Sequence, residues 1–103
     1  MTDVHPSEPI HPGEILADEL AELNMTGADL ARALHVPANR IYQLLAGKRS
    51  MTADTAMRLQ KWLGASAQFW LGLQASYELD VARREMSAEI LDSIEPVHHD
   101  HAA

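Results

Sequence analysis

The sequence contains no cysteine, so neither a disulfide nor a thiolate metal site can stabilise the fold, and nothing points to an oxidising compartment. Aromatic residues are scarce at 5% of the chain, and Leu and Ala dominate over β-branched residues, which favours helices over strands. No apolar run approaches the roughly 18 residues of a membrane span, and the opening MTDVHPSEPIHPGE lacks the features of a targeting signal. We therefore expect an all-α protein with one core, located in the cytoplasm.

Lys and Arg are absent from the first 30 residues, and this gap divides the chain by charge. Residues 1–30 carry seven acids, residues 31–62 carry six basic residues and one acid, and residues 63–103 carry seven acids and two arginines. The middle third is therefore basic although the net charge is −7. A basic face on an acidic body is typical of nucleic-acid binding, with flanks that suit a basic protein partner. Ordinary variation in the charge of helix surfaces is the alternative.

Apolar periodicity and capping residues predict where the helices lie. Thr26 and Asp29 fit a capping box, and Pro37 interrupts the chain between the second and third helices. The predicted helices are 12–23, 26–34, 37–46, 53–63, 67–86 and a short one within 87–94. We expect a loose N-terminal arm at 1–11, a five-helix helix-turn-helix and dimerisation domain at 12–86, and a short helical extension with a disordered tail at 87–103.

The helix predicted at 37–46 has two unlike faces. Its apolar residues Ile41, Leu44 and Leu45 fall on one side of a 3.6-residue period. The opposite side carries Ala38, Asn39, Tyr42 and Gln43. Asn and Gln can pair with adenine in the major groove and Ala can pack on a thymine methyl, so this face is predicted to contact bases. The residues expected to reach phosphates are Arg40, Lys48, Arg49 and Ser50.

Two further surfaces each allow two interpretations. The stripe Glu14, Asp18 and Glu22 on the first helix is either a solvated face or a docking site for a basic partner. The apolar strip on the fifth helix is either core or a dimer interface. Its members are Phe69, Trp70, Leu73 and Tyr77.

Histidines at both ends of the chain raise the possibility of a metal site. His98, His99 and His101 form a short tract, but a flexible tail lacks the supporting hydrogen bonds that fix metal ligands. The sequence has no HExxH motif. We therefore expect a solvated tail, no metal, no cofactor and no enzymatic activity.

Four segments of the chain form a recognisable set: HPGEIL from His11, DLARALHVPANRI from Asp29, GKRSMTADTAMRL from Gly47 and FWLGLQASYELDVAR from Phe69. Together they resemble the HigA/VapI family of antitoxins, a branch of the Cro/repressor-like (XRE-type) helix-turn-helix proteins. The resemblance implies a lambda-repressor-like fold and a dimeric repressor of its own promoter that also binds a RelE/HigB-like mRNA-cleaving toxin. It assigns base contacts to the four outward residues of the third helix. Phosphate contacts are implied for Arg40, Lys48, Arg49 and backbone groups at the start of the second helix.

The chain departs from this family pattern at two positions. Many repressors of the superfamily have Gln just inside the second helix, where it contacts a phosphate, but this chain has Gly27. Ala38, at the first base-contacting position, cannot form a hydrogen bond through its side chain. Two alternatives therefore stand beside the antitoxin prediction: an orphan transcriptional regulator with no toxin, and a protein-interaction module that has lost DNA binding.

Overall fold

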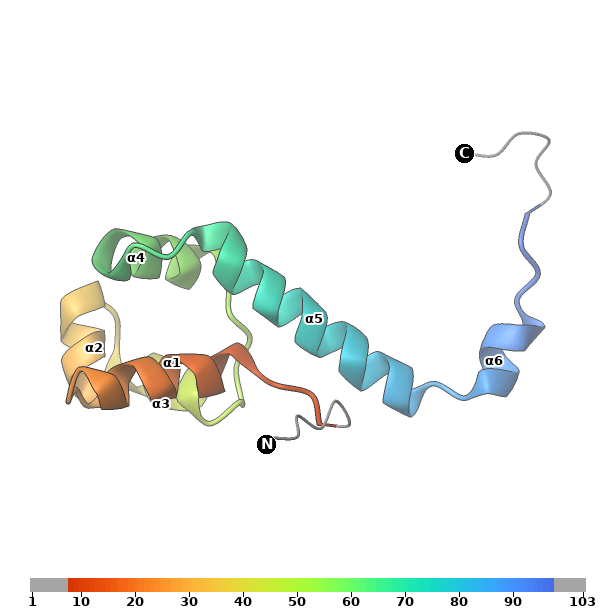
Figure 1. The fold of residues 1–103 in the computed structure, drawn as a ribbon, viewed down its shortest axis with the longest axis horizontal. Coiled ribbons are helices and arrows are strands. Elements are labelled where there is room, and N and C mark those ends of the chain that lie inside the picture. Colours follow the sequence, from red (N-terminus) through yellow and green to blue (C-terminus); the bar gives the residue numbers. More distant parts are fainter. Residues whose placement is uncertain (1–7, 98–103) are drawn as a thin grey trace, which may run out of the picture.

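The computed structural model describes residues 8–97, and within this range the chain forms six helices and no strand (Figure 1). The helices are α1 (Pro12–Glu22), α2 (Gly27–Leu34), α3 (Ala38–Leu45), α4 (Ala53–Leu63), α5 (Ala67–Glu85) and α6 (Ala88–Ser93). The all-α class predicted from the composition is confirmed. None of the helices in 8–97 is long and apolar enough to cross a membrane.

The residues HPGE at the start of α1 each have a structural role. His11 is the N-cap, and its Nδ1 accepts a hydrogen bond of 2.9 Å from the Gly13 N–H. Pro12 occupies the first turn, where a backbone donor is not needed, and Glu14 accepts from the His11 N–H at 3.3 Å. Gly13 is required for packing, because a Cβ there would overlap the carbonyl oxygen of Leu44 and lie 2.9 Å from its carbonyl carbon.

The chain turns tightly from α2 into α3. Thr26 and Asp29 form the predicted capping box, each side chain accepting a hydrogen bond from the other residue's N–H, at 3.0 and 2.9 Å. α2 ends at Leu34, and its C-cap His35 has a left-handed φ of 61°. Pro37 is the N-cap of α3, with φ −62° and ψ 143°. The predicted break between the second and third helices is therefore confirmed.

One core lies between the first four helices and the first half of α5. Its buried apolar side chains are Leu16, Leu20, Leu30, Ala31, Leu34, Ile41, Leu44, Met51, Ala56, Leu59 and Trp70. Trp70 is 1% exposed because the side chains of its own protomer surround the indole. The prediction that Trp70 lies in a dimer interface is therefore wrong.

The second half of α5 and all of α6 extend away from this core (Figure 1). The residues of α5 that are buried, Trp70 and Gln74, both lie in its first half, and α6 has no buried residue. The exposed apolar side chains of this projecting region are Leu79, Met86, Ile90, Leu91, Ile94 and Val97. The division of the chain at residue 86 stays a prediction.

Candidate nucleic-acid interface

The structure places the predicted base-contacting residues together on the outer side of α3. Ile41 and Leu44 are fully buried and hold the helix against the core. The opposite side exposes Ala38, Asn39, Tyr42 and Gln43. α3 therefore presents polar and small side chains in a continuous set while its apolar edge is fixed, as a helix that enters a major groove must do.

Tyr42 is in contact with the start of α2. Its hydroxyl oxygen accepts a hydrogen bond of 3.2 Å from the Ala28 N–H, although half of the side chain is exposed. The ring lies against Gly27, where a Cβ would come within 2.9 Å of Cε1. Because the Asp29 N–H is also occupied, by Thr26, the expectation that free backbone donors of α2 bind a phosphate is wrong for these two groups.

Gln43 is linked to the loop that follows α3. Its Oε1 accepts two hydrogen bonds from Arg49, 3.1 Å from Nε and 2.9 Å from Nη2. This contact holds the guanidinium beside the exposed face of α3. Since Oε1 is the acceptor in both bonds, the amide NH₂ of Gln43 remains a donor that can face a base.

The same loop is attached to α1 and α5. Gly47, with φ of 75°, begins it and lies beside the His11 ring. At its end the Met51 N–H donates to Oε1 of the buried Gln74 at 2.8 Å. These contacts fix the loop backbone while Lys48, Arg49 and Ser50 stay exposed, as their predicted role on phosphates requires.

His11 and Gln74 are the residues of this frame that sequence reasoning missed. In the sequence His11 stands out only as the first residue of HPGEIL, and nothing distinguishes Gln74 from the other helical glutamines. His11 is only 4% exposed, and burial lowers the pKa of its imidazole, against the hydrogen bond with Arg49 and the charge of Glu14, which raise it. One available signal was the position of His11 directly before Pro12, at a helix start.

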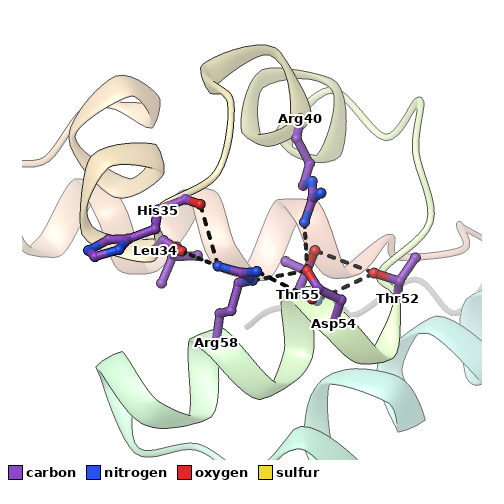
Figure 2. Close-up of polar contacts among 7 residues, drawn as sticks. All are labelled: Leu34, His35, Arg40, Thr52, Asp54, Thr55 and Arg58. Carbon is purple, nitrogen blue, oxygen red and sulfur yellow. Dashed lines mark hydrogen bonds and ion pairs between the residues drawn. The ribbon is translucent and has the colours of Figure 1, made fainter.

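Arg40 belongs to a cluster of charges between α3 and α4, shown in Figure 2. Its Nη1 lies 2.7 Å from Oδ2 of Asp54, and Nε of Arg58 lies 3.0 Å from the same oxygen. Arg58 also donates to the carbonyl oxygens of Leu34 and His35, at 2.8 and 3.4 Å, where α2 ends. The hydrogen bonds from Arg58 and Arg40 lower the pKa of the Asp54 carboxyl.

This cluster changes the interpretation of Arg40. The sequence pattern groups it with Lys48 and Arg49 as a phosphate contact, but its guanidinium is directed at Asp54 and joins α3 to α4 (Figure 2). Phosphate contact by Arg40 stays a prediction, and the structure gives the residue a packing role in addition.

The other predicted sites lie away from α3. Glu14, Asp18 and Glu22 are exposed along α1. Of the α5 strip, Phe69 is exposed, whereas Leu73 is half-buried against the core and Tyr77 contacts His11. In residues 8–97 no group of His, Asp and Glu is arranged to hold a metal ion. The tract His98, His99 and His101 lies outside the described residues.

The sequence and the fold are similar to those of known antitoxins and related proteins. No protein-family model matches the sequence. Virulence-associated protein I from Dichelobacter nodosus is 44% identical over 77 residues, which are 74% of this chain and 71% of that protein. An addiction module antidote protein of the HigA family from Coxiella burnetii has a TM-score of 0.83 at 45% identity, over 87% of this chain and 99% of that one. Pseudomonas aeruginosa antitoxin HigA, in a structure with the higBA promoter, has a TM-score of 0.82 at 43% identity, over 88% and 100%.

Proposed function

Because the chain belongs to the HigA/VapI family of helix-turn-helix antitoxins, we propose that it is the antitoxin of a type II toxin–antitoxin pair. It binds the palindromic operator of its own operon as a dimer and neutralises a RelE/HigB-like toxin that cleaves mRNA. It acts in the cytoplasm, uses no cofactor and catalyses no reaction.

The observation that carries the DNA-binding part is the outer face of α3. Ala38, Asn39 and Gln43 lie on a helix whose opposite edge is buried, next to a loop that packs on His11 and is hydrogen-bonded to Gln74. Base-edge donors and acceptors on a rigid helix read sequence, and adjacent cations position that helix on the phosphates. Lys48 and Arg49 supply these cations.

The dimer and the toxin contact are the finer parts of the proposal. Two copies of α3 must lie roughly 34 Å apart to read successive major grooves, which requires a dimer. The exposed Phe69, near the start of α5, supplies a surface for it. The acidic stripe Glu14, Asp18 and Glu22 on α1 supports binding of a basic toxin, because its carboxylates are exposed to solvent.

The first experiment is a pull-down of the tagged chain from its native cells, with and without nuclease. We expect a small basic toxin to remain bound after nuclease treatment. In the sample that receives no nuclease, we expect promoter DNA to be recovered as well. Recovery of DNA with no such protein would contradict the toxin part and favour the orphan regulator.

DNA reading is tested by fluorescence anisotropy with the recovered promoter duplex. Asn39→Ala should weaken binding because it removes an exposed amide of α3. Gln68→Ala removes an exposed amide from α5 and serves as the matched control. Equal binding by both variants and the wild type would contradict the assignment of α3 as the reading helix and favour the interaction module.

A further inference from the structure

The contact between Tyr42 and the start of α2 depends on Gly27. A Cβ at position 27 would lie 2.9 Å from Cε1, 3.1 Å from Cζ and 3.2 Å from Cδ1 of the tyrosine ring. These distances are shorter than ordinary van der Waals contact, so any larger residue would displace the ring. Gly27 is buried beneath it, and the hydroxyl then lies within 3.2 Å of the Ala28 N–H.

This arrangement fixes the direction in which the Tyr42 hydroxyl can donate. A phenolic oxygen carries one proton and accepts through its lone pairs. Since the oxygen accepts from Ala28, its own proton points away from that amide, toward solvent. Accepting a hydrogen bond polarises the O–H bond and strengthens it as a donor, and the N-terminal end of a helix adds to this effect.

The hydroxyl also lies to the side of the reading face. Tyr42 belongs to α3, but its oxygen is at the neighbouring helix, and in helix-turn-helix complexes that first helix of the motif crosses the DNA backbone. The nearby carboxylate of Asp29 is turned toward the Thr26 N–H and is paired with Arg32, which balances its charge. An anionic oxygen of the DNA backbone is therefore an acceptable partner for the hydroxyl.

We propose that Tyr42 donates its hydroxyl proton to a backbone phosphate of the operator instead of reading a base, and that Gly27 is the positioning residue that makes this possible. The proposal rests on the proposed DNA-binding function. It gives a role to Gly27, the residue that stands where many related repressors have a phosphate-contacting Gln. In this chain the tyrosine from α3 takes that place at the start of α2.

The first test needs no DNA. In ¹H–¹⁵N spectra of the full-length chain, Tyr42→Phe and Gly27→Ala should both shift the Ala28 amide proton upfield and speed its exchange with solvent. Gly72→Ala is the matched control, because a Cβ there meets no atom within 4 Å. An unchanged Ala28 signal in Tyr42→Phe would overturn the proposed contact.

The second test measures affinity for the promoter duplex and for duplexes with single base-pair changes. Tyr42→Phe should weaken binding to all of them alike, by about tenfold, the usual effect of losing a hydrogen bond to a charged group. Gly27→Ala should do the same without lowering the melting temperature, since Ala favours a helix. When Gly27→Ala is added to Tyr42→Phe, the affinity should fall no further, because both changes remove the same contact.

Three results would overturn the proposal. They are unchanged affinity in Tyr42→Phe, a loss confined to one base pair, which would make Tyr42 a base reader, and an additive loss in the double variant, which would give Gly27 an independent role. A wild-type chain that binds none of the duplexes would overturn the DNA-binding function and the phosphate contact with it, whereas the amide spectra would still report whether Gly27 positions Tyr42.

Discussion

The imidazole of His11 meets the ring of Tyr77 edge-on, with ring centroids 4.9 Å apart and planes inclined at 73°. The contact joins the start of α1 to the middle of α5. His11 is also the N-cap of α1, where Nδ1 accepts from the Gly13 N–H. That role requires an unprotonated Nδ1, so the fold selects the neutral imidazole.

The stability of the protein should therefore fall in mildly acidic solution. Burial lowers the pKa of His11 in the folded state, so the unfolded chain binds more protons between that pKa and the ordinary value of 6.5. The free energy of unfolding is then highest above pH 6.5 and decreases as the pH falls through this window. Urea denaturation at a series of pH values measures it. In His11→Asn, which can still cap the helix but does not titrate, this part of the decrease should be absent; parallel curves for the two proteins would contradict the prediction.

Gly13→Ala should destabilise the fold strongly. The added methyl group would collide with the backbone carbonyl of Leu44, which cannot move without displacing α3 from the core. We expect the free energy of unfolding to drop by at least about 2 kcal/mol, in the range typical of overpacked sites. Gly72→Ala, which adds the same methyl group in open space on α5, should leave stability equal or slightly raised. Equal unfolding midpoints for the two variants would show that α1 and α3 are not in close contact.

Asp54→Asn should lower the melting temperature at low salt. It removes the charge that Arg40 and Arg58 share between α3 and α4. Because the cluster is exposed to solvent, the effect should shrink at 1 M salt. The lowered pKa of Asp54 means that the wild type keeps this contribution above pH 3.8 and loses it as the pH falls further, through the folded-state pKa. Asp92→Asn, in the exposed α6, is the control, and a similar change in melting temperature there would refute a specific role for the cluster.

Lys48→Ala should weaken operator binding and reduce its salt dependence. A cation on a phosphate releases about one counterion, so the slope of log affinity against log salt should become smaller by about 0.9. Lys61→Ala removes the same charge from the last turn of α4, at the side of the fold where α2 ends, and should leave the slope unchanged. If the wild type and both variants showed the same salt dependence of affinity, Lys48 would not contact a phosphate.

Phe69→Glu should convert the proposed dimer to monomers and weaken operator binding in parallel. Phe69 is a better position for this test than Leu73 or Tyr77, because its side chain is exposed, whereas Leu73 packs on the core and Tyr77 contacts His11. Sedimentation velocity measures the change, with Met57→Glu on α4 as a control that places the same charge on an exposed apolar site. If the Phe69→Glu variant still formed a dimer, the dimer interface would not include Phe69.

The local features of this fold were predictable from sequence, and the tertiary ones were not. The capping box of Thr26 and Asp29 and the two faces of α3 depend on residues within one or two turns of each other, so periodicity and capping rules find them. The burial of Trp70 depends on how α5 packs against α1 and α4, which no local sequence pattern specifies.

The candidate site shows the same division. The outward set of α3 followed from the helical period, but the partners of its members did not. Arg40 and Asp54, like Tyr42 and Ala28, are brought together only when α3 packs against its neighbouring helices. Sequence reasoning therefore identified which side chains face outward and missed which of them are already engaged.

The loop after α3 is ordered before any ligand arrives, and this has an entropic consequence. A free loop loses roughly 1–2 kcal/mol of conformational freedom for each residue that binding fixes. Here the His11 ring packs beside Gly47 at the start of the loop, and Gln74 holds its backbone at Met51 through a hydrogen bond. Binding then has to immobilise only the side chains of Lys48 and Arg49, so more of their interaction energy is available for affinity.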